Sequence, residues 1–264
     1  MTIVVKLGGA PGNSWAPALD EVARSTDTVL VHGGSEEVDR LGTELGRPMP
    51  YYTSPSGVIS RRCDPPQMEV VTLALTGRVQ TEIVRSLGAR GARAVGLSGV
   101  DGRLLLAKRR HGARAVENGK VVHLAEDRSG TIETVDGALL RTLLGSGVLP
   151  VVGPPAVTAD GEIVNVDADR AAAAVAGAVG AEALVLLTNV GGLLREFPDP
   201  ASRVPRVDRA AIDEVLPLAQ GRMRKKVLAA REALDGGVHR VVIASSSGID
   251  PVRRALQGDG TVFE

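Results

Sequence analysis

Cysteine and aromatic residues are scarce in this sequence of 264 residues, which has one cysteine, one tryptophan, two tyrosines and two phenylalanines. The single cysteine, Cys63, excludes a disulfide framework and a cysteine-rich metal site, and it fits a reducing compartment. Basic and acidic residues balance at 31 each. Bulk electrostatic attraction to nucleic acid or to a membrane surface is therefore not expected, and recognition must come from local patches.

Long hydrophobic runs and targeting signals are also missing. The N-terminus has no basic segment followed by an apolar run, so no signal peptide is expected. The longest apolar stretch, residues 171–187, is mostly alanine and is interrupted by Glu182, which predicts a buried helix running into a strand. We expect a soluble cytoplasmic protein with neither a nucleic-acid nor a membrane partner.

Strand-like and helix-like segments alternate along the chain, which predicts an α/β fold with a parallel-sheet core. The predicted strands include residues 3–7, 28–31, 94–97, 131–135, 148–152, 184–187 and 240–244. The predicted helices include residues 17–24, 36–45, 64–87, 136–144 and 212–216, the alanine-rich stretch, and a segment beginning at Gly221.

Two predicted strands end in a pair of glycines. The first strand ends in Lys6-Leu7 and is followed by Gly8-Gly9, and the second is followed by His32-Gly33-Gly34-Ser35. A loop without side chains lets a phosphate approach backbone N–H groups, and a nearby lysine can reach the same anion. Either string alone is equally compatible with an ordinary glycine turn, but two such loops at the ends of parallel strands reinforce each other.

A long helix is predicted at 64–87, with Asp64 as N-cap, Pro65 at the first helical position and Gln67 completing a capping-box-like pattern. Its apolar residues repeat every four positions, so the helix either presents a face to a second subunit or packs within its own chain. Arg61 and Arg62 precede this helix. They are either a solvated pair or a guanidinium site that binds a carboxylate.

Basic residues concentrate in one segment, residues 103–124, whose Asn118-Gly119 predicts a hairpin turn. This hairpin is either a solvated edge that discourages aggregation or a docking patch. It carries Lys108, Arg109, Arg110, His111, Arg114 and Lys120.

Two polar motifs lie in the second half of the chain. The first, Asn165-Val166-Asp167-Ala168-Asp169, precedes the alanine-rich helix, so an aspartate could cap that helix, or all three polar groups could share one face if the segment is extended. The second motif, residues 221–227, places four cations at a helix start, where they oppose the helix dipole. Such a cluster favours an anionic partner, although a solvated cluster remains an alternative.

These elements together describe a site for a phosphate that is being moved, yet the Walker A motif, the kinase His-Arg-Asp motif and the Gly-x-Ser-x-Gly esterase elbow are all absent. Over essentially its whole length the chain resembles the amino acid kinase family, specifically its acetylglutamate kinase branch. The resemblance rests on five elements in order: Lys6-Leu7-Gly8-Gly9, His32-Gly33-Gly34, Arg61, Asn165-Val166-Asp167-Ala168-Asp169 and Met223-Arg224-Lys225-Lys226-Val227.

The resemblance implies a three-layer αβα sandwich with an open, mainly parallel central sheet, of the carbamate kinase-like kind. It implies one domain, 1–264, with an N-terminal lobe 1–178 that holds an acidic amino acid and a C-terminal lobe 179–264 that holds ATP. Mg²⁺ would be held mainly by the nucleotide phosphates, so no metal site of the protein's own is expected.

By similarity, Lys6 and Lys226 would balance charge on the phosphoryl group in flight, and Asp169 would hold both lysines in place. The phosphates would meet backbone N–H groups and polar side chains from Gly8, Gly9, Gly33, Gly34, Thr188, Asn189 and Gly192. The substrate would be bound by Gly34, Ser35, Arg61 and Asn165. A carboxylate nucleophile is already ionised at neutral pH, so no general base is needed.

Three departures from the acetylglutamate kinase pattern bear on the substrate: Ser35 replaces a third glycine, Asp167 replaces an asparagine, and residues 53–61 lack the usual Gly-Leu-Arg approach. These features look more like the kinases that phosphorylate 2-aminoadipate carried on an acidic amino-group carrier protein in lysine biosynthesis. The basic hairpin would then dock the carrier through Lys108, Arg109, Arg110 and Arg114.

Two other functions stay open. One is a kinase of free N-acetylglutamate in arginine biosynthesis, and the other is a non-catalytic nucleotide or amino-acid sensor, against which the presence of Lys6, Asp169 and Lys226 together speaks. No segment resembles the N-terminal helix of ring-forming relatives, so we expect a homodimer formed through the helix at 64–87.

Overall fold

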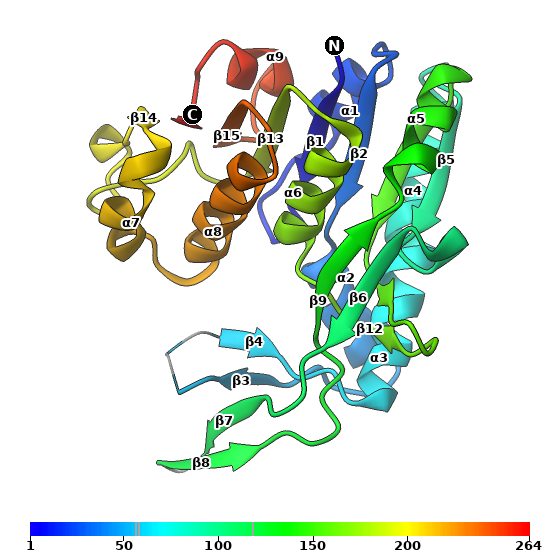
Figure 1. Cartoon of the computed structure of the whole chain (residues 1–264), viewed down its shortest axis with the longest axis vertical. Helices are drawn as coiled ribbons and strands as arrows, with labels where there is room; N and C mark the ends of the chain where they lie inside the picture. Colours follow the sequence, from blue (N-terminus) through cyan, green and yellow to red (C-terminus); the bar gives the residue numbers. More distant parts are fainter. Residues whose placement is uncertain (56, 58, 118) are drawn as a thin grey trace.

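An eight-stranded sheet forms the centre of the protein (Figure 1), in a computed structural model that describes residues 1–55, 57, 59–117 and 119–264. All neighbouring strands are parallel except the pair β15 and β16. The mainly parallel sheet predicted from the sequence is therefore confirmed. Its strands, in spatial order, are β14 (Arg206–Val207), β16 (Thr261–Phe263), β15 (Arg240–Ser245), β13 (Ala183–Thr188), β1 (Ile3–Leu7), β2 (Thr28–His32), β10 (Leu149–Gly153) and β5 (Ala94–Ser98).

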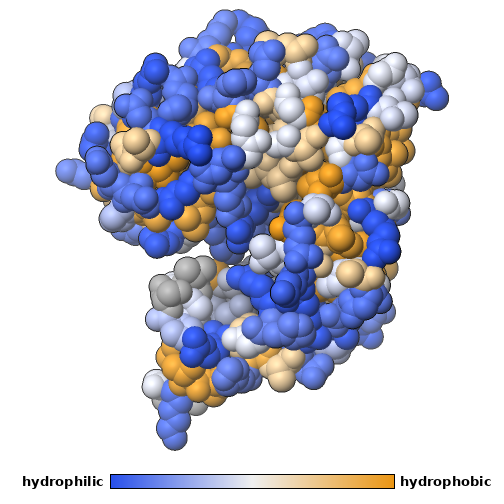
Figure 2. Space-filling view, in the orientation of Figure 1, coloured by the Kyte–Doolittle hydropathy of each residue, from blue (hydrophilic) through white to orange (hydrophobic). Residues whose placement is uncertain are grey.

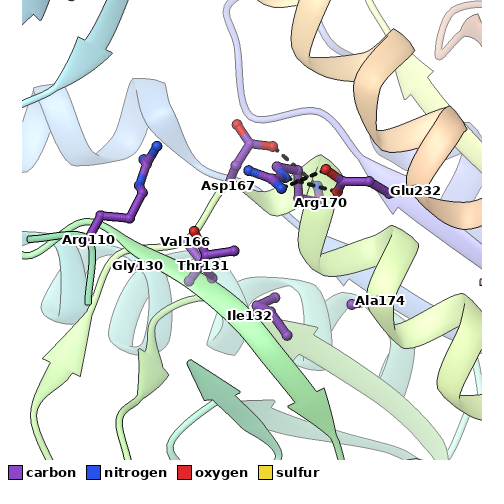
Figure 3. A pocket seen from close by; sticks show the side chains of 9 residues that line it. All are labelled: Arg110, Gly130, Thr131, Ile132, Val166, Asp167, Arg170, Ala174 and Glu232. Atoms are coloured by element: carbon purple, nitrogen blue, oxygen red, sulfur yellow. Dashed lines mark hydrogen bonds and ion pairs between the residues drawn. The ribbon is translucent and has the colours of Figure 1, made fainter. Parts of the chain in front are cut away.

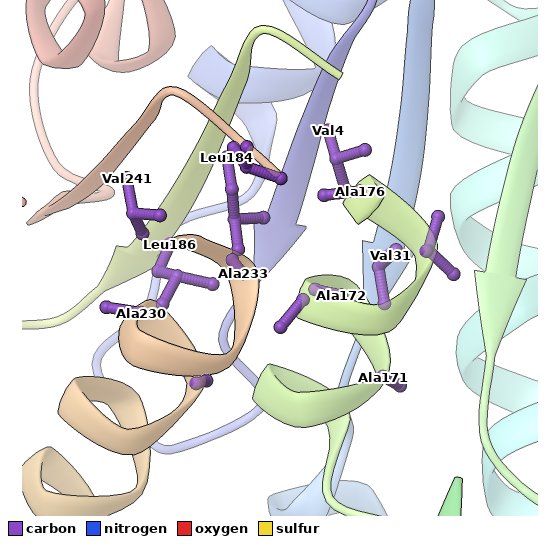
Figure 4. Close-up of a cluster of buried hydrophobic side chains, with 14 of the residues drawn as sticks. Val4, Val31, Ala171, Ala172, Ala176, Leu184, Leu186, Ala230, Ala233 and Val241 are labelled. Atoms are coloured by element: carbon purple, nitrogen blue, oxygen red, sulfur yellow. The ribbon is translucent and has the colours of Figure 1, made fainter. Parts of the chain in front are cut away.

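Helices cover both faces of this sheet, because alternate residues of its buried strands point to opposite sides. Val4 belongs to one hydrophobic core and Val5 to the other. Figure 4 shows part of the first core, which includes residues of α5 (Gly137–Gly145), α6 (Ala168–Val179) and α8 (Gly221–Asp235). The second core includes residues of α1 (Ala16–Val22), α2 (Ser35–Glu44) and α9 (Pro251–Leu256). The predicted three-layer arrangement is confirmed.

The long helix predicted at 64–87 is a continuous helical segment. It consists of α3 (Pro65–Thr72), a π-helical stretch η1 (Leu73–Gln80) and α4 (Thr81–Gly88). The residues repeating every four positions are buried within this chain, namely Val71, Leu75, Val79 and Ile83. Asp64 holds the N-cap position, but its side chain accepts from Arg62 Nε at 2.8 Å and makes no capping hydrogen bond, so the predicted capping box is wrong.

A second sheet has the order β12 (Ile163–Val164), β11 (Ala156–Val157), β6 (Leu105–Arg109) and β9 (Gly130–Val135). The sequence places residues 131–135 in the parallel core, and this prediction is wrong. Strand β9 pairs antiparallel with β6, and its Ile132 packs on the first core from outside the central sheet. A short apolar strand does not reveal by itself which sheet it joins.

Two hairpins stand apart from both sheets: β3 (Tyr51–Thr53) with β4 (Ile59–Arg61), and β7 (Arg114–Glu117) with β8 (Lys120–His123). The basic hairpin predicted over 103–124 is thus only partly right, because Lys108 and Arg109 belong to β6, which pairs with β9. Gly112, at φ +78°, lies between β6 and β7. Residues 56, 58 and 118, which belong to the segments singled out from the sequence, lie outside the described residues.

The remaining helical elements are short. They are η2 (Asp101–Arg103), η3 (Pro200–Ser202), η4 (Arg209–Ala211), α7 (Ile212–Val215) and η5 (Leu216–Leu218). Within the described residues, no helix has both the length and the apolar character needed to cross a bilayer.

The parallel strands gather several loops at one edge of the central sheet. Strands β1, β2, β13 and β15 are neighbours and run in one direction, so their carboxyl ends lie together. Asn189, just after β13, donates its amide to the carbonyl of Pro11 in the loop after β1, at 3.2 Å. Ser14 N donates to Ser246 Oγ, after β15, at 3.2 Å. This edge is where a ligand site is expected.

His32, at the end of β2, makes the fold sensitive to acid. It is fully buried, and burial lowers the pKa of its imidazole from 6.5 to about 4 even though hydrogen bonding to the Gly33 carbonyl opposes this. Because the pKa is lower in the folded than in the unfolded state, stability is full above pH 6.5 and falls as the pH drops toward 4.

We expect the free energy of unfolding to fall by about 2 kcal/mol between pH 7.5 and pH 5 through this residue alone. Urea unfolding at a series of pH values measures it. The variant His32→Gln should flatten the profile in this window, whereas His123→Gln, at an exposed position on β8, should not. An equally steep profile in His32→Gln would contradict the assignment.

Candidate active site

Three charged side chains from distant parts of the sequence meet in the interior. Lys6 lies on β1, Asp169 in the first turn of α6 and Lys226 on α8, and they are 5%, 6% and 7% exposed. Lys6 Nζ is 2.7 Å from Asp169 Oδ1. Lys226 Nζ is 3.0 Å from Oδ1 and 2.8 Å from Oδ2 of the same carboxylate. One buried carboxylate thus holds two ammonium groups.

The electrostatics of this cluster keep Asp169 ionised. Burial by itself raises the pKa of the Asp169 carboxyl, but the charges of Lys226 and Lys6 and their hydrogen bonds outweigh burial and hold its pKa well below the usual range. The stability that this carboxylate contributes is therefore present above its ordinary pKa and lost only as the pH falls through the depressed value. Burial also lowers the pKa of the Lys226 ammonium, which Asp169 opposes.

The start of α6 explains why the three polar residues of its motif do not share a face. Asp167 is the N-cap, and its Oδ1 accepts from the N–H groups of Asp169 and Arg170 at 3.0 and 3.2 Å. The chain is therefore helical, not extended, when it reaches Asp169. Asp167 also lies 3.7 Å from the ammonium group of Lys225, so two of the four cations at the start of α8 face acids of α6.

Asn165 lies two residues before Asp167 and contacts a different part of the chain. Its Nδ2 donates to Cys63 Sγ at 3.4 Å, which places Asn165 near the residues that follow β4. Burial raises the pKa of the Cys63 thiol to about 12, so this cysteine is a packed thiol and not a nucleophile at neutral pH.

The two glycine loops lie against each other. A Cβ on Gly9 would be 2.1 Å from the backbone nitrogen of Gly34, and a Cβ on Gly34 would be 2.6 Å from a methyl group of Leu75. Only glycine allows this approach. Throughout the described chain, the N–H groups of Gly9 and Gly34 have no hydrogen-bond acceptor, so both donors are unpaired there.

The other two glycines differ from the expectation that their N–H groups would meet phosphates. Gly8 N donates to the Leu187 carbonyl and Gly33 N to the Leu7 carbonyl, each at 3.1 Å. These bonds extend the pairing of the central sheet beyond the strand ends. Gly8 and Gly33 therefore shape the loops, while Gly9 and Gly34 carry the free donors.

Ser35 and Arg61 lie together at the start of α2. The Ser35 hydroxyl donates to the Gly9 carbonyl at 2.9 Å, which links the two glycine loops. Arg61 Nη2 donates to the Ser35 carbonyl at 3.1 Å and to the Tyr51 hydroxyl at 2.7 Å, while its Nη1 pairs with Asp39. The guanidinium, which is largely buried, is thus fixed beside the glycine loops.

The predicted nucleotide residues lie on the β13 side of the same edge. Thr188 ends β13 and is buried, and Asn189 contacts the loop after β1. Gly192 has φ +140°, and a Cβ there would lie 2.5 Å from Thr261 Oγ1, so this glycine is required by packing against β16.

The basic residues predicted to dock the carrier differ in their exposure to solvent. Arg109 is used within the chain: its Nη1 is 2.9 Å from Glu162, and its Nε donates to the Asp127 carbonyl at 3.0 Å. This differs from the docking role expected of it. Lys108, Arg110 and Arg114 are exposed.

Sequence reasoning missed the residues that hold the predicted ones in place. Asp39 and Tyr51 fix Arg61, and Trp15 donates its indole N–H to the Gly8 carbonyl at 2.8 Å. A signal for Asp39 existed, because it lies one helical turn after Ser35 on α2. Nothing local in the sequence connects Trp15 with a glycine seven residues earlier.

The molecule has a hollow in its surface and a cavity near the start of α6. Figure 2 shows the surface hollowed between the body that carries α8 and the arm formed by the two hairpins. A cavity of ≈ 350 Å³ lies beside Asp167, and its lining includes Arg110, Arg170 and Glu232 (Figure 3). Lys6, Asp169 and Lys226 do not line this cavity.

Two fixed cations, two free N–H groups and a mostly buried arginine converge at one sheet edge. Such an arrangement places anions near one another and offsets their repulsion, as phosphoryl transfer requires. Residues 1–245 match the amino acid kinase family. The chain belongs to this family. The resemblance drawn from the five sequence motifs is thereby confirmed.

Relatives within the family cover nearly the whole chain. A LysW-aminoadipate kinase of Thermus thermophilus is 45% identical over 98% of this chain and 99% of its own length. A LysW-aminoadipate kinase of Deinococcus radiodurans is 45% identical over 98% of this chain and 90% of its own length. An acetylglutamate kinase of Methanopyrus kandleri is 36% identical, covering 98% of both chains.

Solved structures agree on the fold. The protein smu.665 of Streptococcus mutans superposes with a TM-score of 0.75 at 20% identity, covering 99% of this chain and 98% of its own. A carbamate kinase of Giardia has a TM-score of 0.67 at 15% identity, covering 99% and 98%. The carbamate kinase-like fold expected from the sequence is confirmed.

The contact between the glycine loops predicts that Gly9→Ala is severely damaging. The added methyl group meets the Gly34 backbone, so the loops must separate, and displacement of about 1 Å in a transfer site can cost about a hundredfold in turnover. Steady-state kinetics measure the loss. Gly145→Ala, at the end of α5 with no atom within 4 Å of the new Cβ, should leave turnover unchanged. Similar kinetics for both variants would refute this account.

Proposed function

We propose that this protein is an ATP-dependent kinase that phosphorylates the side-chain carboxylate of 2-aminoadipate carried on an acidic amino-group carrier protein, with carrier-bound glutamate as a second acceptor. The observation that carries the proposal is the buried Lys6–Asp169–Lys226 cluster beside two facing glycine loops. The relatives named for LysW-aminoadipate, at 45% identity along nearly the whole chain, support the choice of acceptor.

In the proposed reaction, an oxygen of the acceptor carboxylate attacks the γ-phosphorus of ATP. The bond from that phosphorus to the bridging oxygen breaks, ADP leaves with the electron pair, and an acyl phosphate forms. The attacking carboxylate is ionised at neutral pH, so no residue needs to remove a proton. Asp169 stays ionised and paired, so it takes no part as an acid or base.

Lys6 and Lys226 offset the charge of the phosphoryl group as it moves between the two anions. Their positions are fixed before any ligand binds, because both ammonium groups bond to the same carboxylate. Preorganised charge of this kind needs no rearrangement during the reaction and is usually the largest catalytic contribution. The free N–H groups of Gly9 and Gly34 add two donors on the same side.

The acceptor lies, in this proposal, between Arg61 and Asn165. A substrate attached through its amino group retains its α-carboxylate, for which the Arg61 guanidinium is the matching group. Arg61 already bonds to Ser35 and Asp39, which fixes its orientation. Asn165 contributes its side-chain amide, whose Nδ2 donates to Cys63 Sγ.

The nucleotide lies, in this proposal, on the β13 side of the sheet edge, near Thr188, Asn189 and Gly192. Mg²⁺ accompanies it and is held mainly by the phosphates, where it offsets their negative charge. The donor set fits this arrangement, because the Asp169 carboxylate is already paired with two lysines.

The carrier docks, in this proposal, on the two hairpins and the neighbouring basic residues. Four of the exposed large apolar residues belong to these hairpins, namely Tyr51, Ile59, Val116 and Val121, and they are 41–59% exposed. Figure 2 shows apolar colour on this arm of the molecule, with hydrophilic residues around it. Lys108, Arg110 and Arg114 supply positive charge for an acidic partner, which would steer association.

We further propose that residues 1–178 bind the carrier-borne substrate and 179–264 bind ATP, and that two chains form a homodimer through the helical segment at 64–87. The buried face of that segment packs within its own chain, so a partner would meet its outer face, where Leu73 is 49% exposed.

Comparison of acceptors tests the function. Purified carrier protein bearing 2-aminoadipate, the same carrier bearing glutamate, and free N-acetylglutamate are each supplied with ATP, and the acyl phosphate is trapped with hydroxylamine. We expect turnover with the aminoadipate conjugate. Turnover with free N-acetylglutamate and none with either conjugate would instead establish an acetylglutamate kinase, and absence of turnover with all three would favour a sensor.

The double variant Lys108→Glu/Arg114→Glu should raise KM for the conjugate about tenfold and leave kcat nearly unchanged, because exposed rim charges act mainly on encounter. Arg206→Glu/Arg209→Glu, at exposed positions on β14 and η4, reverses the same number of charges and is the control. A KM unaffected by the double variant would move the docking surface elsewhere.

Lys226→Ala tests the catalytic assignment. Removal of one of two cations on the moving phosphoryl group should lower kcat by about a hundredfold or more, while ATP binding measured by calorimetry persists. Arg224→Ala, two residues away at an exposed position, should retain near-normal turnover. Unchanged turnover in Lys226→Ala would remove Lys226 from the mechanism.

A further inference from the structure

Helices α6 and α8, which carry Asp169 and Lys226, lie side by side and run in the same direction. Asp167 meets Lys225 and Asp169 meets Lys226 near their beginnings. Farther along, a Cβ on Gly177 would lie 3.1 Å from the carbonyl of Gly236, at the end of α8. The residue numbers of the contacting pairs increase together along both helices, so the helices are parallel. The position of Lys226 relative to Asp169 depends on how these two helices are aligned along their length.

Many buried residues of both helices are small. The buried residues of α6 include Ala171, Ala172, Ala173 and Ala176, and those of α8 include Ala229, Ala230 and Ala233. Figure 4 shows several of these methyl groups lying between the helices and the sheet. Alanine and glycine allow close approach but form shallow ridges, so they resist axial sliding less than large interdigitating side chains do.

Besides the contacts of Asp167 and Asp169, an ion pair between the partly exposed side chains of Arg170 and Glu232 joins the helices. Arg170 Nη2 is 2.6 Å from Glu232 Oε1, and Arg170 Nε donates to Glu232 Oε2 at 2.9 Å. This is a bidentate pair, whose geometry tolerates little displacement. Figure 3 shows it at the wall of the cavity beside Asp167. Arg170 immediately follows Asp169, and Glu232 lies six residues after Lys226 on α8.

We propose that Arg170 and Glu232 are positioning residues for phosphoryl transfer: their bidentate pair fixes the axial alignment of α8 on α6, so that Lys226 is held at Asp169. The inference rests on the proposed catalytic role of Lys226. Neither residue belongs to the Lys6–Asp169–Lys226 cluster. The pair therefore acts through the alignment of the helices and not by contact with the moving phosphoryl group. The methyl groups set the distance between the helices, and the ion pair sets their alignment.

Kinetics of single and exchanged variants test the alignment. Arg170→Ala and Glu232→Ala should each lower kcat about tenfold, less than the loss expected for a full 1 Å displacement, with KM for ATP changed by less than about twofold. The exchange Arg170→Glu/Glu232→Arg restores a pair and should recover most of kcat. Arg231→Ala, which removes a pair between α8 and Asp213 of α7, is the control and should behave as wild type.

A second measurement needs no substrate. The acylation rate of Lys226 by an amine-reactive ester, followed by mass spectrometry with exposed Lys120 as internal reference, reports whether Asp169 still holds the ammonium group. Lys226 should react faster in both alanine variants than in wild type or in the Arg231 control. If wild-type protein phosphorylates no acceptor, the proposed function fails, and this rate still decides the alignment.

Wild-type kcat and unaltered Lys226 acylation in Arg170→Ala would overturn the inference. A second result would also overturn it: the exchanged variant unfolds at the wild-type temperature but does not recover activity. The individual residues, and not the ion pair between them, would then be what activity requires.

Discussion

The site depends on one carboxylate, that of Asp169, which lies between two buried ammonium groups. Placing three charges where water is nearly absent is unfavourable unless each is paired, and removal of one partner from such a buried cluster typically costs about 3–5 kcal/mol. The cluster is therefore a poor source of stability and a good source of fixed positive charge. A structure that keeps it must have a use for two cations in one place.

The parallel sheet makes this pairing possible. Lys6 comes from the central strand β1, and the helices that carry Asp169 and Lys226 each lead into a strand, β13 and β15, on one side of it. Connections between parallel strands cross over one face of the sheet, so α6 and α8 become neighbours and begin at the same edge. The glycine loops after β1 and β2 end at that edge as well. Cations and free N–H groups thus converge from segments that are mostly distant in the sequence.

Part of this arrangement could be predicted from the sequence because it depends on local patterns. Glycine pairs after β-branched strands, a proline at the start of the long helix and basic residues at the start of α8 are all visible in short windows. The predictions that failed concern partners. Residues 131–135 form a strand as predicted but join a separate sheet, and Arg109 is turned inward by Glu162, which lies 53 residues away.

The sequence by itself determined which groups are candidates for the chemistry: two lysines, one aspartate and two pairs of glycines. It also determined most strands of the central sheet and the longer helices, because hydrophobic periodicity acts over a few residues. Only the tertiary structure decided which glycine donors remain free, which basic residues are exposed, and that Arg170 and Glu232 join the two helices of the site. These properties depend on hydrogen bonds and ion pairs between segments distant in sequence, and their partners are chosen by packing.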